Sequence, residues 1–333
     1  MSARLSTLLR TLFFLCVGIL LLYYVFQKQG ADWQKLRTDF AGVHYGWIAL
    51  VVVCFLFSNV NRVIRWQMLI KPLGYILHFA PAYLSTLSCY FANAIIPRSG
   101  ELLRPVLVSR YEGIPFEKIF GTVAVDRLVD TISFLTVTVL GFILEYKVLS
   151  EFLASQKAHP TTSEQGNSML FICIAIIIFL IIALIWFKRK KLQKHRYYQF
   201  IKSKLIGFLE GIQSIKKIKT IRNFILHSLS VWLMFYLMIY FGFKSFDPVA
   251  HLDLRAALLI MVFGAFGMVI PTPGGIGSYQ FLVTTALTNF YNINPSDAFS
   301  FSNIMFFTQY LTNIGFGFLS YLLLPLFYSK KGV

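Results

Sequence analysis

The chain has 333 residues, of which 57% are hydrophobic and 14% charged, and its formal net charge is +17. Soluble domains carry roughly 25% charged residues, so this composition excludes an ordinary soluble domain and indicates an integral membrane protein. The positive charge concentrates at 188–222, directly after an apolar segment, which favours a cytoplasmic flank in contact with anionic lipid over nucleic-acid binding.

Apolar segments that could form membrane helices follow one another along the chain. A span needs about 20 residues, which most of the segments meet, whereas 278–291 is short and 99–112 is too polar to cross alone. The first segment is expected to be a retained helix rather than a cleaved signal peptide, because no small-x-small cleavage site follows it. The segments are 8–26, 46–69, 78–96, 117–144, 168–187, 223–243, 254–270, 278–291 and 300–328.

Basic flanks set the expected orientation. They place both termini, the end of the second segment and the run after the fifth segment in the cytoplasm. The fourth segment must then leave the cytoplasm, so an even number of crossings separates it from the second. The simplest solution is a re-entrant hairpin that enters along 78–96, turns at Pro97–Gly100 and returns along 101–112.

A second hairpin is expected in the other half, entering from the outside. Segment 254–270 would dip inward, break at Pro271–Gly277 and return along 278–291, although two full crossings satisfy the same orientation. Non-helical backbone at membrane depth is tolerated only where protein or a wet cavity surrounds it. Two broken hairpins of opposite entry, one in each half, are typical of an inverted-repeat transporter.

We therefore predict an all-α integral membrane protein, a polytopic helical bundle with about eight membrane segments that include both hairpins. It forms a single domain over 1–333, with a first half at about 1–150 and a second half at about 168–333. The connector at about 188–222 is expected to be an amphipathic helix on the cytoplasmic leaflet or an ordinary helix packed on the bundle. The polar loop 145–167 is expected outside.

Ionisable residues cluster at the first hairpin and on the segment after it. Charged groups at membrane depth are functional candidates, and a guanidinium can bind a phosphate bidentately. Two interpretations remain open: partly unpaired arginines that bind an anionic head group, or a buried ion-pair network that holds the hairpin. The candidates are Arg98, Glu101, Arg104, Asp126, Arg127 and Asp130.

Three glycines, Gly274, Gly275 and Gly277, precede a short helix expected to begin near Ser278. A helix N-terminus presents free backbone N–H groups to an anion, and glycine lets a lipid phosphate approach the backbone. The alternative is a simple break that lets two half-helices pack. A nucleotide-binding P-loop is excluded, because no lysine follows these glycines.

Arg62 and Arg65 are interpreted as positive-inside anchors at the cytoplasmic end of the second segment, with a cytoplasmic entry gate as the alternative. The cysteines lie in apolar segments without a CxxC pair, and the histidines form no HExxH motif. We therefore expect no metal site and no cofactor.

Three motifs in this order, "NAIIPRSGELLRP", "RYEGIPFEKIFGTVAVDRLVD" and "IPTPGGIGSYQ", resemble the flippase-like family, also called the lysylphosphatidylglycerol synthase transmembrane region family. The resemblance covers essentially the whole chain. It implies a role in lipid translocation or in the handling of lipid-linked glycans. The chain ends at Val333, so the cytosolic transferase domain of the bifunctional synthases is not expected and the synthase activity is not carried over.

The resemblance also implies site residues, by motif. Asp126 and Gln280 stand where the family commonly has glutamate, and the loss of a charge at Gln280 puts proton coupling at that position in doubt. The matching residues are Pro97, Arg98, Gly100, Glu101 and Arg104 in the first motif, Arg127 and Asp130 in the second, and Pro273, Gly274, Gly275 and Gly277 in the third.

The leading hypothesis is translocation of an anionic phospholipid or a polyprenyl-phosphate-type lipid between the leaflets of the cell membrane, without enzymatic turnover. Arg98, Arg104 and Arg127 would hold the phosphate, and Glu101, Asp126 and Asp130 would orient the arginines. The alternatives are a membrane-embedded transferase of lipid-linked glycan or aminoacyl-lipid metabolism and a scaffold subunit of a lipid-synthesis complex. Expected partners are membrane lipids and, for the scaffold, a lipid-modifying enzyme.

Overall fold

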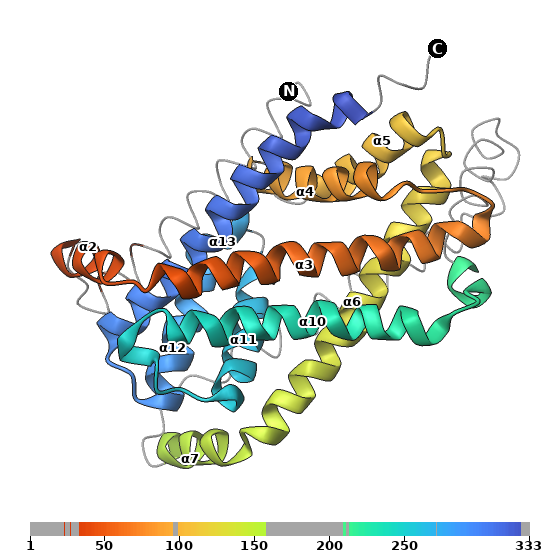
Figure 1. The fold of residues 1–333 in the computed structure, drawn as a ribbon. Helices are drawn as coiled ribbons and strands as arrows, with labels where there is room; N and C mark the ends of the chain where they lie inside the picture. The colour runs from red at the N-terminus through yellow and green to blue at the C-terminus, as the bar shows by residue number, and fades with distance from the viewer. Residues whose placement is uncertain are drawn as a thin grey trace, which may run out of the picture.

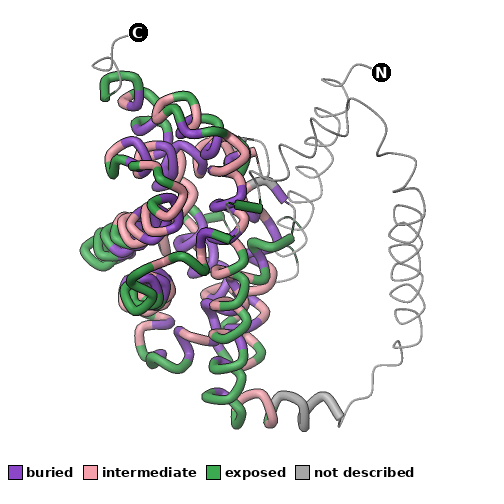
Figure 2. The backbone as a smooth tube through the Cα atoms, turned by 90° about the vertical axis from the view of Figure 1, so that its right-hand side faces the viewer, coloured by how far each residue is buried: buried purple, intermediate pink, exposed green. Residues whose placement is uncertain are grey.

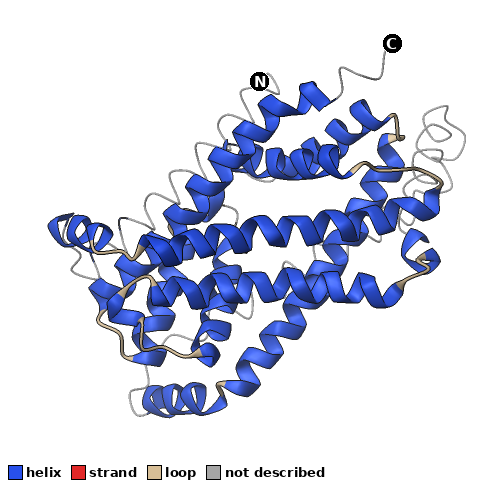
Figure 3. Cartoon of the chain, in the orientation of Figure 1, coloured by secondary structure: helices blue, strands red, loops and turns tan. Residues whose placement is uncertain are grey.

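The computed structural model describes residues 33–95, 99–157, 209–210, 213–270 and 272–327, together with Tyr23 and Gln27. Within these ranges the chain folds into helices without strands, which confirms the all-α prediction (Figure 3). The expected segments 8–26 and 168–187 and most of the connector 188–222 lie outside the described residues.

Most of the helices follow the predicted segments. In the first half they are α2 (Trp33–Ala41), α3 (Tyr45–Ile70), α4 (Phe79–Ile95), α5 (Gly100–Glu112), α6 (Phe116–Leu144) and α7 (Tyr146–Lys157). In the second half they are α10 (Ile221–Lys244), α11 (Leu254–Val269), α12 (Ser278–Tyr291) and α13 (Pro295–Leu323). However, α2 lies in none of the predicted segments, and α7 shows that the first part of the expected loop 145–167 is helical.

Local sequence signals explain where several helices begin and end. Gly113 adopts a left-handed conformation with φ +67° after α5, and Pro115 then precedes α6. The side chain of Asp253 accepts the N–H of Ala256 at 2.9 Å at the start of α11. Asn294 caps α13 in the same way, ahead of a proline at the first helical position.

Among the described residues, four helices are long and apolar enough to cross a membrane: α3, α6, α10 and α13. The outward face of α6 illustrates the reason, because large apolar side chains recur on it at intervals of three or four residues and remain exposed. An apolar stripe of this length is unfavourable in water and fits a lipid environment. The protein is therefore a multi-pass membrane protein. The exposed side chains on α6 include Leu128, Ile132, Leu135, Val139 and Ile143.

Helices α3 and α10 lie side by side through the middle of the bundle (Figure 1). Helices α4 and α5 pack on each other as one hairpin, and α11 and α12 pack on each other as a second. The long helix α13 packs along α4, while α6 packs against α11. Each hairpin is thus held by a long helix of the opposite half as well as by its own.

Buried residues gather where the helices face one another, and exposed residues lie around the outside (Figure 2). The larger apolar core joins the first part of α3 with α10, α11, α12 and α13. A smaller core surrounds Trp66 and joins the end of α3 with α4, α5 and α6.

Candidate functional site

A cavity of about 800 Å³ lies between the two halves and receives side chains from both hairpins. Asn93 and Glu101 line it from the first hairpin, and Thr272, Gly274 and Gly275 line it from the second. Most of the remaining wall is apolar or aromatic and comes from α6, α10, α11 and α13. Large concave pockets with a few polar groups in an apolar wall are the usual form of ligand sites.

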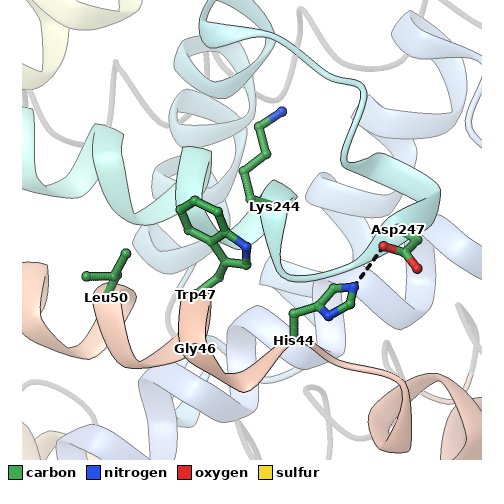
Figure 4. A pocket seen from close by; sticks show the side chains of 6 residues that line it. All are labelled: His44, Gly46, Trp47, Leu50, Lys244 and Asp247. Carbon is green, nitrogen blue, oxygen red and sulfur yellow. Dashed lines mark hydrogen bonds and ion pairs between the residues drawn. The ribbon is translucent and has the colours of Figure 1, made fainter.

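A smaller pocket of about 440 Å³ lies at the start of α3, beside the end of α10 (Figure 4). Its His44 Nε2 is 3.0 Å from Asp247 Oδ1, and both side chains are more than half exposed. Lys244 donates to the backbone carbonyl of Ala250. Because its charged groups already pair with protein groups at an exposed surface, this pocket is the weaker candidate.

A buried ion-pair network joins α3 to α6 beside the larger cavity. The Nε of Arg65 donates to Asp126 Oδ1 at 2.9 Å, and its Nη2 donates to Asp130 Oδ1 at 2.7 Å and also to Asp126. Arg62 Nη1 donates to Asp130 Oδ2 at 2.7 Å. This arrangement corrects the interpretation of both arginines as membrane anchors, because Arg62 is 5% and Arg65 0% exposed.

Arg104 enters the same network from α5. Its Nη1 is 3.2 Å from Asp126 Oδ2, and its guanidinium lies over the ring of Trp66, 3.8 Å from the centroid. It is 1% exposed and does not line the cavity. Its Nε and Nη2 make no hydrogen bond within the described residues. The position of Arg104 away from the cavity nevertheless favours the ion-pair interpretation over direct contact with a head group.

Arg127 and Arg62 supply the positive charge at the cavity wall. The Nε of Arg127 is 3.8 Å from Glu101 Oε1, beyond hydrogen-bond distance, and both side chains are partly exposed. Neither Arg62 Nε nor Arg127 Nε makes a hydrogen bond within the described part of the chain. The N–H groups of these two arginines can therefore donate hydrogen bonds to a bound anion.

The glycine segment of the second hairpin forms a short 3₁₀ turn, Pro273–Gly275, before α12. Gly274 and Gly275 have φ of +61° and +83°, which favours glycine at both positions. A Cβ at Gly274 would lie 2.8 Å from the ring of Tyr310, whose hydroxyl donates to the Ala94 carbonyl at 3.5 Å. Tyr310 on α13 thus contacts the ends of both hairpins.

The start of α12 at Ser278 agrees with the prediction, but its N–H groups are not all free. Gln280 Oε1 accepts the N–H of Gly277 at 2.9 Å, so a side chain of the helix itself takes one of the donors expected to face an anion. Gln280 is 0% exposed and does not line the cavity. Gln280 Nε2 is buried and makes no hydrogen bond within the described residues, so the side chain caps α12 through its oxygen alone.

The structure brings only part of the predicted set to the cavity. Arg98, like residues 96 and 97, lies outside the described residues. Those that line the cavity are Glu101, Arg127, Asp130, Gly274 and Gly275. Those that pack or pair behind it are Gly100, Arg104, Asp126, Gly277 and Gln280, and Pro273 begins the turn before α12.

Sequence reasoning missed Arg62 as a cavity residue and Arg65 as the centre of the ion pairs. A signal was present, because Arg62 and Arg65 are three apart and Asp126 and Asp130 are four apart. Each pair shares one helix face, and their charges are complementary. Trp232, Gln309 and Asn313 also line the cavity and were missed, because nothing in the local sequence marks them.

Comparison with known proteins places the chain among membrane proteins. The family described as lysylphosphatidylglycerol synthase TM region matches residues 8–317. A relative, the UPF0104 membrane protein MJ1595 of Methanocaldococcus jannaschii, is 27% identical over 316 residues, which cover 84% of this chain and 86% of the relative. No solved structure matches the chain.

Proposed function

The chain belongs to the lysylphosphatidylglycerol synthase transmembrane region family, and on this premise we propose that it moves an anionic phospholipid or a polyprenyl-phosphate-type lipid between the leaflets. The observation that carries the proposal is the cavity between the hairpins, where Arg62 and Arg127 offer unpaired N–H groups within a largely apolar wall. A lipid phosphate is costly to place in hydrocarbon, and paired guanidinium groups offset that cost.

The charges around the cavity favour an anion. The cluster holds four arginines and three carboxylates, which leaves an excess of one positive charge. The arginines are Arg62, Arg65, Arg104 and Arg127. Asp126 and Asp130 both pair with Arg65 and thereby hold α6 against α3. Arg127 is the most solvent-accessible of the four arginines.

The function is tested by reconstituting the purified protein in liposomes that contain labelled lipids. Movement of an anionic lipid between leaflets without turnover supports the proposal. Chemical conversion of the lipid would indicate the membrane transferase instead. Absence of both activities would favour a scaffold that acts with a lipid-modifying enzyme.

Arg127→Gln is expected to lower lipid movement while the protein stays folded. Hydrogen bonds to charged groups contribute about 1.5–3 kcal/mol, so the rate should fall about 10- to 100-fold. The loose pair with Glu101 contributes only about 0–1 kcal/mol to stability. Arg110→Gln, an exposed arginine on α5 outside the cavity, is the matched control and should leave the rate unchanged. Equal rates for both variants would contradict the role of Arg127.

The orientation remains part of the proposal: both termini and the connector 188–222 in the cytoplasm, and 145–167 outside. Because Arg62 and Arg65 are buried, they do not indicate the orientation of the chain. The basic run after residue 187 is then the main support for the proposed orientation. A single cysteine at Ser163, in a background without the four native cysteines, should react with an impermeant reagent on intact cells. Reaction only after permeabilisation would contradict this orientation.

The packing supports the proposal that the halves are related as inverted repeats. The helices can be paired as α3 with α10, α4 with α11, α5 with α12 and α6 with α13. Each contact among these eight helices then has an equivalent contact between their counterparts, whereas the contacts of α2 and α7 have none. The contact of α4 with α13, for example, corresponds to that of α11 with α6. In such transporters both broken hairpins meet at one substrate site, as the two hairpins do at this cavity.

A further inference from the structure

Arg104 uses only one part of its guanidinium in the ion-pair network. Its Nη1 pairs with Asp126, whereas its Nε and Nη2 are buried and have no hydrogen-bond partner among the described residues. These two nitrogens form one edge of the planar guanidinium, with which an arginine can bind an anion through two parallel hydrogen bonds. Because buried donors are nearly always hydrogen-bonded, this edge indicates an acceptor that the described residues do not supply.

The hydroxyl of Ser85 on α4 is a second buried polar group without a partner in the described part of the chain. The hydroxyls of Thr86 and Ser88, on the same helix, each donate to the backbone carbonyl four residues earlier. Ser85 is 0% exposed and makes no such bond. Its hydroxyl is therefore available to another group.

The hairpin places Ser85 opposite Arg104. A Cβ at Gly100 would lie 2.6 Å from the Sγ of Cys89, so these two residues face each other across the hairpin. Helices α4 and α5 run in opposite directions, and residues four apart lie on the same helix face. Ser85 lies one turn from Cys89 and Arg104 lies one turn from Gly100, both away from the hairpin tip. The three unpartnered groups therefore converge between α4 and α5.

The charge of the cluster is unbalanced where it is most deeply placed. Arg127 and Glu101 are both partly exposed and cancel each other. The other described members of the cluster have side chains at most 15% exposed, and their three arginines and two aspartates leave one positive charge. A buried charge without a counter-charge is costly, so one monovalent anion would restore the balance. A water molecule could accept from Arg104 but would leave the charge uncompensated. These members are Arg62, Arg65, Arg104, Asp126 and Asp130.

The surroundings favour a small free anion over a lipid phosphate. Neither Ser85 nor Arg104 lines either of the two cavities described above. The ring of Trp66 covers the guanidinium of Arg104 at 3.8 Å, and its indole N–H already donates to Thr122. A head group that carries acyl chains needs an open path to its site, whereas a spherical ion needs only a closed space with donors.

We propose that the hairpin of α4 and α5 holds a buried chloride ion between the Nε–Nη2 edge of Arg104 and the hydroxyl of Ser85. The ion accepts hydrogen bonds from both side chains and neutralises the excess charge, which stabilises the packing of the hairpin against α3 and α6. This site is separate from the cavity and does not rest on the proposed function.

The test measures the thermal unfolding midpoint of the purified protein in detergent while chloride replaces gluconate at constant ionic strength. Gluconate is too large for a closed site, so both salts screen surface charge but only chloride can occupy the site. A ligand that binds the folded state alone raises its stability. The midpoint should therefore rise with chloride to a plateau, by at least about 2 °C.

Ser85→Ala should raise the chloride concentration at half of the full effect about ten-fold, because it removes a hydrogen bond to a charged group. Ser88→Ala is the matched control, since Ser88 is an equally buried serine of α4 whose hydroxyl already donates to Leu84. It should leave that concentration unchanged. Arg104→Met should remove both the unbalanced charge and the response, and give a folded protein whose midpoint is the same in both salts.

Equal midpoints of the wild-type protein in both salts would overturn the proposal in favour of a buried water. A response that is lost in Arg127→Gln but unchanged in Ser85→Ala would overturn the placement, because the ion would then bind at the cavity. Crystals grown in bromide should show an anomalous scattering peak between Ser85 and Arg104. Bromide peaks at other positions alone would also overturn the proposal.

Discussion

Replacing Asp126 with asparagine is expected to destabilise the protein by about 3–5 kcal/mol, the usual cost of removing one partner of a buried ion pair. Asp126 is 0% exposed and accepts from both Arg65 and Arg104. An asparagine of nearly the same size would leave Arg104 without a carboxylate and Arg65 with only Asp130. The loss is measured as the free energy of unfolding in mixed micelles.

Glu101→Gln is the control for this change. Glu101 is half-exposed, and its 3.8 Å contact with Arg127 should contribute less than about 1 kcal/mol. Adding Arg104→Met to Asp126→Asn should recover part of the lost stability, because it removes one buried charge without a partner. If Asp126→Asn and Glu101→Gln lower the free energy of unfolding by the same small amount, the ion-pair network does not stabilise the fold.

Gly100→Ala is expected to cost about 3 kcal/mol or more, because the added methyl group has no room in a packed interior. A Cβ at Gly100 would lie 2.1 Å from the backbone oxygen of Cys89 and 2.6 Å from its Sγ. A carbonyl cannot turn aside as a side chain can, so α4 and α5 would have to separate. The measurements are the yield of folded protein and the free energy of unfolding.

The matched control is Gly46→Ala, in the first turn of α3, where a Cβ meets nothing within 4 Å. Alanine is the better helix former by about 0.8–1.0 kcal/mol, so this variant should be neutral or more stable. Comparable losses for both variants would mean that the close approach of α4 and α5 does not limit the fold. Cys89→Ala should not rescue Gly100→Ala, because the nearest obstacle is backbone.

The helices could be predicted from the sequence because each apolar segment carries its own length and end signals. The expected start of α12 near Ser278 illustrates this, since glycines with positive φ precede it. The pairing of the two halves could not be predicted. The packing of α13 along α4 depends on contacts between residues more than 200 positions apart, which leave no local pattern.

The candidate site could be predicted only in part, because some of its residues have a local sequence signal and others depend on distant contacts. Charged residues at membrane depth drew attention to Arg127 and Asp130, which do line the cavity. Arg62 lies near the end of a long helix, where a basic residue usually marks the membrane surface, and only the facing aspartates on α6 reveal its burial. Gln280 shows the opposite case: its motif implied binding, yet its side chain caps α12.

The contact of Tyr310 with both hairpins bears on how far the two hairpins can move relative to each other. Tyr310 contacts Ala94 at the end of α4 and Gly274 in the turn before α12, so one side chain contacts both hairpins. Its stacking on Phe306, with centroids 5.5 Å apart, keeps it in that position. The two hairpins are therefore coupled through one aromatic side chain, and a movement of one hairpin changes its contact with the other.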